Sequence, residues 1–333
     1  MASLTEQIKD SRSFILSTHT QPDGDGIGSQ LALYWALKKI GKNVRIINVD
    51  DISKKYDFLD PHRVIETISK LKTPITRTDI GLIFDTNDQE LLLELWPLLQ
   101  KNCGKISFID HHPLLERRPL QANEHLIDVE ASSTGQIVFN LIKTLQIPLD
   151  AQIALPIYSS IVFDTNYFRY IRGSPTPHLI VAELLRHNIE PQKVHRHLFG
   201  NHSPNKLKFL SRILGLVEYE LDGRLALVRV QRQDMDELGL ENDETRDVID
   251  MIMNVESIEA AVLFRDEGKD TFKLSFRSKG LITVSHLAEN LGGGGHQFAS
   301  GVLMKGTFEE VKGKVLAAFQ KLFGELEKKV AST

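Results

Sequence analysis

The chain has 333 residues, of which 41% are hydrophobic and 25% are charged, a composition typical of a globular protein with about two domains. Its net charge of -4 excludes the bulk basic field with which proteins hold long nucleic acid non-specifically. The single cysteine, Cys103, excludes an intrachain disulfide and fits a reducing compartment. The first residues lack the pattern of a secretory signal, and no apolar window reaches the roughly 18 residues of a membrane span, so we expect a cytoplasmic protein that does not bind membranes.

Residues 1–190 alternate between short apolar runs and helix-like segments. We predict strands at 14–16, 44–49, 80–84 and 105–109, and helices at 31–40, 91–99 and from 132 to about 145, with Ser and Thr at 132–134 as caps. A further apolar segment covers 151–163. Strands that alternate with helices indicate βαβ units, so we expect an α/β fold with a mostly parallel sheet flanked by helices.

The stretch 17–29, between the first predicted strand and the first helix, carries His19, Asp23 and Asp25 among three glycines. Histidine and carboxylates at the carboxyl end of a strand suit Mn²⁺, Mg²⁺ or Zn²⁺. We expect the glycines at 24, 26 and 28 to let the backbone bend sharply and to leave room for an ion. The alternative is an Asp-Gly-rich turn that caps the helix, although capping does not require the histidine.

Three later polar positions also follow apolar runs. Asp85 follows the third strand, Asp110, His111 and His112 follow the next strand, and Asp164 follows the segment 151–163 in the same way. Ligands in open α/β sheets gather outside the carboxyl ends of the strands, so these positions are expected to converge with the stretch 17–29 on one metal site. Asp85 or Asp164 taken alone is also compatible with a helix cap.

Pro191, Gly200 and Pro204 interrupt the pattern between about 190 and 214, which predicts a linker with some helix. His195, His197 and His202 lie in this segment, but no cysteine or carboxylate accompanies them in the pattern expected of a metal site. We therefore interpret them as part of a solvated connector.

Residues 215 to about 330 form a second, smaller α/β unit in this interpretation. We predict strands at 224–230, 260–264 and 271–276, with a hairpin turn at 266–270, and helices at 243–253, 284–291 and 308–327. Lys273, Ser275 and Arg277 alternate onto one face of their strand, where Arg277 could grip a phosphate. Four glycines at 292–295 precede His296, and such backbone can wrap an anion. The alternative is a flexible loop beside a solvated strand face.

The motif His19-x3-Asp23-x-Asp25-Gly26, followed in order by Asp85, Asp110-His111-His112 and Asp164, is similar to the four motifs of the DHH phosphoesterase superfamily. Arg277 and the run Gly292–His296 resemble the DHHA1 domain that accompanies it. Length and domain content look like the NrnA type of this superfamily. Asn166 stands where such relatives commonly have glycine, and asparagine also tolerates left-handed backbone.

The resemblance implies a DHH domain at 1–190, a linker at 191–214 and a DHHA1 domain at 215–333, with the active site in the cleft between the two domains. It implies two Mn²⁺ ions, with Mg²⁺ or other divalent ions as substitutes. His19 and Asp23 would hold the first ion and Asp25, His111 and Asp164 the second, with Asp85 between them. Asp110 would orient an imidazole, and His112 would either bind a substrate phosphate or protonate the leaving oxygen. The expected substrate-binding residues are His112, Arg277, Ser278, Gly294, Gly295 and His296.

The implied activity is manganese-dependent hydrolysis of short 5′-phosphorylated oligoribonucleotides such as pApA to mononucleotides, with dephosphorylation of 3′-phosphoadenosine 5′-phosphate (pAp). Asp85, Asp110 and His112 would be the catalytic residues. The expected partners are these small substrates and their mononucleotide products rather than long nucleic acid, with a homodimer as a further expectation. Two alternatives stay open, a cyclic di-AMP phosphodiesterase and a nucleotide-binding regulator without catalysis.

Overall fold

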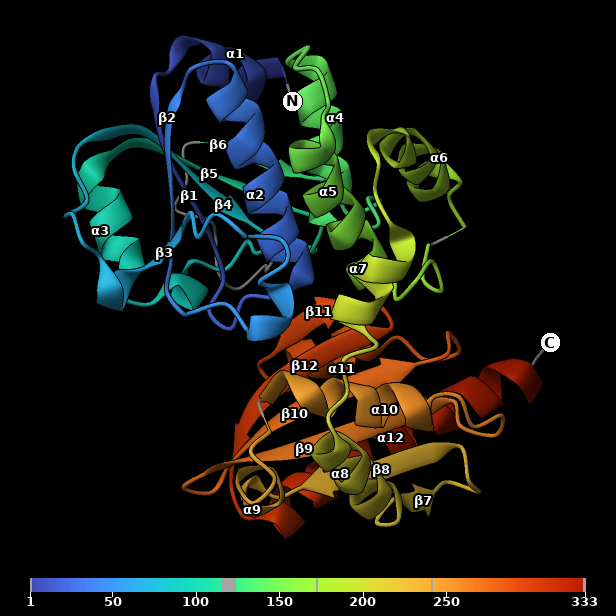
Figure 1. The fold of residues 1–333 in the computed structure, drawn as a ribbon. Helices are drawn as coiled ribbons and strands as arrows, with labels where there is room; N and C mark the ends of the chain where they lie inside the picture. Colours follow the sequence, from blue (N-terminus) through green and yellow to red (C-terminus); the bar gives the residue numbers. More distant parts are fainter. Residues whose placement is uncertain (1, 115–123, 172, 241, 332–333) are drawn as a thin grey trace. The chain divides into compact units, whose positions relative to one another are not determined.

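The computed structural model describes residues 2–114, 124–171, 173–240 and 242–331, and it divides into two compact units, residues 1–201 and 202–333 (Figure 1). Each unit has its own sheet and its own hydrophobic core. The predicted linker 191–214 contributes one helix to each unit, α7 (Pro191–Leu198) to the first and α8 (Pro204–Leu214) to the second. Among the described residues, no helix is long and apolar enough to span a membrane.

The first unit is built on a parallel sheet whose strand order is β3-β2-β1-β4-β5-β6. The order reverses between β1 and β4, since the chain passes from β1 to β2 and β3 on one side and then returns to β4 on the other. The strands are β1 (Ser13–Thr18), β2 (Asn43–Asn48), β3 (Ile65–Thr67), β4 (Thr78–Phe84), β5 (Cys103–Asp110) and β6 (Glu124–Ile127).

Helices cover both faces of this sheet, which confirms the predicted α/β layering. The larger core lies under α1, α2, α4 and α5, and a smaller core lies on the opposite face under α3 (Figure 1). The helices of the unit, besides α7, are α1 (Ala2–Asp10), α2 (Gly24–Lys39), α3 (Leu95–Asn102), α4 (Thr134–Thr144), α5 (Ala151–Asp164) and α6 (Thr176–Leu184). Short 3-10 turns occupy Lys54–Tyr56, Ile68–Lys70, Gln89–Leu92 and Leu185–His187.

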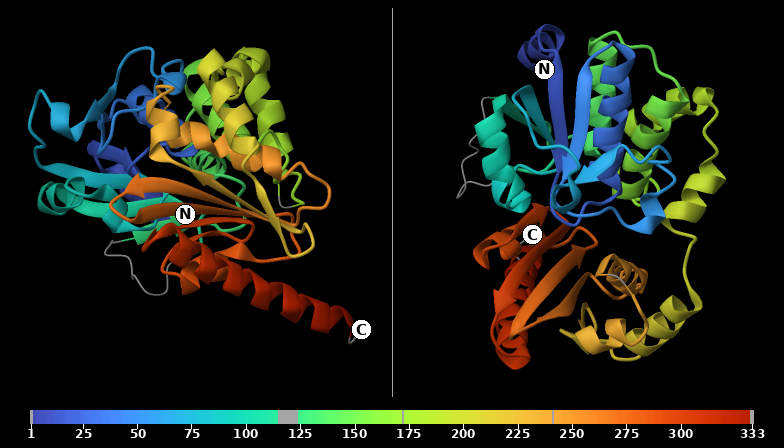
Figure 2. Two further views of the ribbon diagram at one scale, coloured as in Figure 1. Left: turned by 90° about the horizontal axis from the view of Figure 1, so that it is seen from below. Right: turned by 60° about the vertical axis from the view of Figure 1, so that its left-hand side comes forward.

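The second unit has a mixed sheet of order β11-β12-β10-β9-β8-β7, in which only β8 and β9 pair in parallel. The long helix α12 packs on one face and α8, α9 and α10 pack on the other (Figure 2). Its strands are β7 (Glu218–Glu220), β8 (Leu225–Val230), β9 (Ala260–Gly268), β10 (Thr271–Ser278), β11 (Gly294–His296) and β12 (Ala299–Lys305). The helices after α8 are α9 (Arg232–Asp236), α10 (Arg246–Ile252), α11 (Val284–Asn290) and α12 (Phe308–Ala331), and a 3-10 turn covers Asn242–Thr245.

Two local expectations were wrong. The segment 151–163, which we grouped with strand ends, is helix α5; it is apolar on nearly all sides because it is buried among α2, α4 and α6, so no helical period marks it. The helix predicted at 31–40 starts at Gly24, so the three glycines lie in its first turns and make no sharp bend.

These glycines instead allow α2 to pack closely. A Cβ atom on Gly24 would lie 2.6 Å from the Phe163 ring, and one on Gly26 would lie 2.2 Å from Thr18 Oγ1. A Cβ atom on Gly28 would lie 2.5 Å from the carbonyl oxygen of Pro156 in α5. At all three positions, therefore, the structure shows that the missing side chain lets α2 approach its neighbours closely, and it shows no room for an ion there.

We predict that Gly28→Ala destabilises the protein by about 1–3 kcal/mol, because the new methyl group meets backbone that cannot rotate away. Denaturation with urea, followed by circular dichroism, measures the shift. Gly313→Ala in α12 is the matched control, since nothing lies within 4 Å of the position that its new methyl group would occupy; it should be neutral or stabilise by up to about 1 kcal/mol. An unchanged midpoint for Gly28→Ala would contradict this account of the α2–α5 contact.

Candidate metal centre

The predicted ligands of the first unit gather where the strand order of its sheet reverses. His19 follows β1, Asp85 follows β4, and Asp110 ends β5 with His111 and His112 directly after it. These three strands are neighbours and parallel, so their carboxyl ends share one edge. This edge, beside the switch between β1 and β4, is where open α/β sheets bind ligands.

Helices supply the remaining members of the group. Asp23 is the N-cap of α2, where its carboxylate accepts from the backbone N–H groups of Asp25 and Gly26, and Asp25 lies in the first turn. Asp164 is the last residue of α5. The expected convergence is therefore correct, but Asp164 comes from the end of a helix rather than from a strand.

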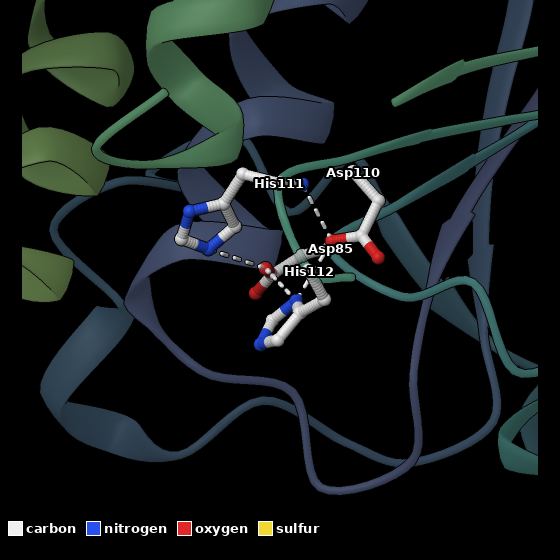
Figure 3. A group of neighbouring side chains, drawn as sticks. All are labelled: Asp85, Asp110, His111 and His112. Atoms are coloured by element: carbon white, nitrogen blue, oxygen red, sulfur yellow. Dashed lines mark hydrogen bonds and ion pairs between the residues drawn. The ribbon is translucent and has the colours of Figure 1, made fainter. Parts of the chain in front are cut away.

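The side chains form three overlapping groups in which the ligand atoms all lie within 4.8 Å of one another. Asp85 and His111 each belong to two groups, so the three form one continuous cluster (Figure 3 shows its central part). The groups are His19, Asp23 and Asp85; Asp25, His111 and Asp164; and Asp85, Asp110, His111 and His112.

The imidazole of His111 is surrounded by hydrogen-bond acceptors. Its Nδ1 lies 3.3 Å from the carbonyl oxygen of Ala131, and a carbonyl can only accept, so Nδ1 is the donor in this contact. Its Nε2 faces carboxylate oxygens of Asp25 and Asp164 at 3.5 Å and of Asp85 at 3.7 Å. A ring nitrogen that faces several carboxylates requires a proton or a bound cation between them.

His19 repeats this arrangement at the other end of the cluster. Its Nδ1 lies 2.7 Å from the carbonyl oxygen of Thr20, and its Nε2 lies 3.5 Å from Asp85 Oδ2. In proteins, a histidine that binds a metal through one nitrogen typically donates its other N–H to such a carbonyl. Both histidines thus have the orientation that metal-binding histidines typically show.

Asp25 is completely buried and held by several donors. The backbone N–H groups of Thr134 and Gly135, at the N-terminus of α4, donate to it over 2.8 and 3.2 Å, and the hydroxyls of Ser29 and Ser160 donate as well. A helix N-terminus favours a negative charge. Burial nevertheless raises the pKa of Asp25 to about 6, with His111 opposing the rise and Asp164 adding to it.

Asp85 is strained and repelled by its neighbours. Its backbone is left-handed, with φ of +59°, which costs of order 1 kcal/mol in a residue other than glycine and is often found at functional sites. The Thr134 hydroxyl donates to its carboxylate over 3.2 Å. Burial raises the pKa of Asp85 well above its usual range, and the nearby carboxylates of Asp25, Asp23 and Asp110 add to this rise.

Asp110 and His112 form a tight pair beside these ligands. His112 Nδ1 donates to Asp110 Oδ1 over 2.8 Å, so Nε2 is the nitrogen of this ring that points away from the pair, and the side chain is 33% exposed. Although burial alone would raise the pKa of Asp110, the charge and hydrogen bond of His112 lower it. Burial likewise opposes protonation of His112, but Asp110 raises its pKa to about 9.

Sequence reasoning missed Asn87, which joins this pair. Asn87 Nδ2 lies 2.9 Å from Asp110 Oδ2 and 3.0 Å from the carbonyl oxygens of His112 and Pro113. The only signal in the sequence is its position two residues after the strand-end Asp85.

In the second unit the sheet register aligns two of the predicted substrate-binding residues. Ala299 of β12 pairs with Arg277 of β10 on one side and with His296 of β11 on the other. Arg277 Nη1 donates to the Phe276 carbonyl oxygen, and Nε lies 4.0 Å from Asp250 Oδ1. The side chain of His296 lies outside the described part of the structure.

The other predicted residues there have local structural roles. Ser278 is buried, and its hydroxyl accepts the N–H of Gly280 over 3.1 Å. Gly294 and Gly295 lie in a strand rather than a loop, and Gly295 has φ of +131° close against the backbone of β12. The expected cleft between the domains stays a prediction.

The linker histidines do not join a metal group among the described residues. His197 stacks on Phe58 with ring centroids 4.5 Å apart, and His202 Nε2 lies 3.3 Å from Asp247.

We predict that Asp85→Asn raises the melting temperature of the metal-free protein, because the amide removes a repelled, buried charge while its oxygen can still accept from Thr134. Thermal unfolding in EDTA at pH 8 measures this, and Asp10→Asn, an exposed position in the same unit, is the control with no expected shift. A lower melting temperature for Asp85→Asn would show that the carboxylate stabilises the fold without a metal.

Comparison with known proteins supports the motif analysis. The model of the DHH family, N-terminal domain, matches residues 13–161, and the DHHA1 domain model matches residues 222–325. The bifunctional oligoribonuclease and PAP phosphatase NrnA of Thermus thermophilus is 29% identical over 294 residues, which are 87% of this chain and 84% of that protein.

Two solved structures share the fold. An exopolyphosphatase-related protein from Bacteroides fragilis superposes with a TM-score of 0.86 at 24% identity, over 98% of this chain and 97% of that one. RecJ of Thermus thermophilus in complex with Mn²⁺ superposes with a TM-score of 0.51 at 14% identity, over all of this chain and 54% of RecJ. The resemblance inferred from the motifs is thus confirmed, and the chain belongs to the DHH family, with a DHHA1 domain after its DHH domain.

Proposed function

We propose that this protein is a manganese-dependent phosphohydrolase that cleaves short 5′-phosphorylated oligoribonucleotides such as pApA to mononucleotides and dephosphorylates pAp. The family assignment and the oligoribonuclease and PAP phosphatase activities named for the Thermus relative support this proposal. The net charge of -4 favours small anionic substrates held by local groups over long nucleic acid.

The observation that carries the proposal is the surroundings of His111. An imidazole whose Nε2 faces three carboxylates at 3.5–3.7 Å brings nitrogen and oxygen ligands together with several negative charges. A divalent cation balances these charges and reverses the raised pKa values of the carboxylates. Nitrogen and oxygen donors of this kind suit Mn²⁺ and Mg²⁺.

We assign His19 and Asp23 to one ion and Asp25, His111 and Asp164 to the other, with Asp85 shared between them. The overlap of the side-chain groups at Asp85 supports this division. Two such ions, when bound, supply a nucleophilic hydroxide and stabilise the attacking and leaving oxygens. The strained backbone and the burial of Asp85 suit a residue whose single carboxylate is shared by the two ion positions.

Hydrolysis forms a P–O bond from water and breaks the bond to the leaving ribose oxygen, which takes up a proton. His112 has its Nδ1 engaged by Asp110, so Nε2 is the nitrogen that we assign to the substrate. An imidazole held in this way either protonates that leaving oxygen or donates a hydrogen bond to a phosphate oxygen. Both roles require the same orientation of the ring.

The far phosphate of a short substrate is assigned to the second unit. Arg277 and His296 flank Ala299 at one level of the sheet, so a phosphate bound there would meet groups from two strands. Ser278 is assigned to the same phosphate, because its hydroxyl accepts from the Gly280 N–H and keeps its own O–H to donate. Gly294 and Gly295 would contribute through their backbone.

A substrate panel tests the function. Purified protein with Mn²⁺ is incubated with pAp, with oligomers of two to five nucleotides and with cyclic di-AMP, and phosphate and mononucleotides are quantified. We expect pAp and the dinucleotide to be hydrolysed, and the cyclic compound to react more slowly. Faster hydrolysis of cyclic di-AMP would favour a cyclic dinucleotide phosphodiesterase, and tight binding without product would favour a regulator.

We predict that Asp85→Asn lowers turnover of pApA with Mn²⁺ by more than about 100-fold, because this carboxylate is shared by both ion positions. The same preparation also tests whether Mn²⁺ still raises the melting temperature. Asp10→Asn should keep wild-type turnover. Retained Mn²⁺-dependent turnover in Asp85→Asn would remove Asp85 from the centre.

We predict that Arg277→Ala lowers kcat/KM for pApA by roughly 10- to 100-fold, chiefly through KM, because one charged hydrogen-bond donor to a phosphate is lost. Initial rates over a range of substrate concentrations separate the two constants. Lys305→Ala, an exposed cation at the other end of the neighbouring strand, controls for general electrostatic effects. Equal losses of kcat/KM in Arg277→Ala and Lys305→Ala would indicate that the substrate is attracted by charge alone.

A further inference from the structure

We propose that Asn87 is a positioning residue for the proposed reaction, because it fixes Asp110 and the backbone of His112 together and so holds the His112 ring toward the substrate. This inference rests on the proposed function. Asn87 would touch neither substrate nor metal, and its effect would pass entirely through His112.

Asn87 spans the carboxyl ends of two neighbouring strands. It lies three residues after the end of β4, and all three acceptors of its amide follow or end β5. Nδ2 lies 2.9 Å from Asp110 Oδ2 and 3.0 Å from the carbonyl oxygens of His112 and Pro113. The two hydrogens of one amide group are thus shared among three acceptors, which leaves that group no freedom to turn.

Asp110 depends on this amide. It is fully buried, and a buried carboxylate needs donors around both of its oxygens. Oδ1 accepts from His112 Nδ1 and from the His111 N–H, each over 2.8 Å. Oδ2 accepts from Asn87. Loss of the Asn87 amide removes a donor from this second oxygen, which weakens the hold on the carboxylate that orients the imidazole.

The same amide also acts on the backbone of His112. Its bonds to the carbonyl oxygens of His112 and Pro113 fix the direction in which the chain leaves β5. The His112 ring is 33% exposed, so packing alone does not lock it. The ring is therefore oriented by Asp110 and by its own backbone, and Asn87 holds both of these.

Asn87 is distinct from the ligands of the metal centre. Asn87 is not among the six residues that we assign to the two ions, and its amide nitrogen donates to Asp110 and to the backbone after β5. An amide nitrogen that donates offers no lone pair to a cation, so the contacts made by Nδ2 are not metal contacts. Substitution of Asn87 should accordingly leave Mn²⁺ binding intact while it disturbs His112.

A double-mutant cycle tests the proposal. Asn87→Leu keeps the size of the side chain but removes both N–H donors, and His112→Ala removes the group on which it is proposed to act. We expect Asn87→Leu to lower kcat for pApA by about 10- to 100-fold. In the His112→Ala background the same substitution should change kcat by less than about threefold, because its target is already gone.

Asn48→Leu is the matched control. Asn48 ends β2 of the same sheet and is fully buried, but its side-chain amide makes no hydrogen bond to the described residues, the Asp110–His112 pair included. Its substitution should change kcat by less than about twofold. The increase in melting temperature caused by Mn²⁺ should be the same for wild type, Asn87→Leu and Asn48→Leu. If Asn87→Leu does not fold, Asn87→Ala takes its place in the cycle.

The outcomes separate the positioning role from the proposed function. An inactive wild-type protein would overturn the proposed function itself. If the wild type is active, a kcat of Asn87→Leu equal to that of wild type would overturn the positioning role alone. The same conclusion would follow if Asn87→Leu lowered kcat by the same factor with and without His112→Ala. Loss of the Mn²⁺-induced rise in melting temperature in Asn87→Leu would also overturn it, since Asn87 would then support the metal centre.

Discussion

The candidate metal centre depends on one arrangement, in which His111 Nε2 faces carboxylates from three different elements. Asp25 comes from α2, Asp85 from the end of β4 and Asp164 from the end of α5. The negative charges of these three carboxylates repel one another, and burial strengthens the repulsion. The fold must therefore hold these elements together against their own carboxylates until a cation binds. Much of the packing around the site follows from this requirement.

Glycines provide the necessary close packing between helices. Gly28 of α2 meets the backbone of α5, and a Cβ atom on Gly135 of α4 would lie 2.0 Å from the Ser160 hydroxyl oxygen of α5. That hydroxyl donates to Asp25, as do the backbone N–H groups of Thr134 and Gly135. The glycine that brings α4 against α5 thus also brings a helix N-terminus to the buried carboxylate. Close packing and charge stabilisation are achieved by the same residues.

The sequence was sufficient to predict the sheet edge and most of the cluster, because a polar residue directly after an apolar strand marks the end of that strand. It was insufficient where tertiary packing overrides a local pattern. The segment 151–163 carries no helical period because it is buried on most sides. The glycines at 24, 26 and 28 suggested a sharp bend, although they lie in a helix. The left-handed backbone of Asp85 is also invisible in the sequence, since most aspartates have negative φ even though aspartate adopts positive φ more often than most residues.

Asn87 shows most clearly why part of a site escapes sequence reasoning. A metal ligand is recognisable by its residue type and spacing, whereas a residue that orients another is defined only by its hydrogen bonds. Nothing in the chemistry of asparagine distinguishes Asn87 from the equally buried Asn48 at the end of β2. The difference is the partner, since the amide of Asn87 bridges β4 to the Asp110–His112 pair. Residues that position a catalytic group must therefore be sought by tracing the donors of its buried carboxylate, one contact outward from the groups that the motifs identify.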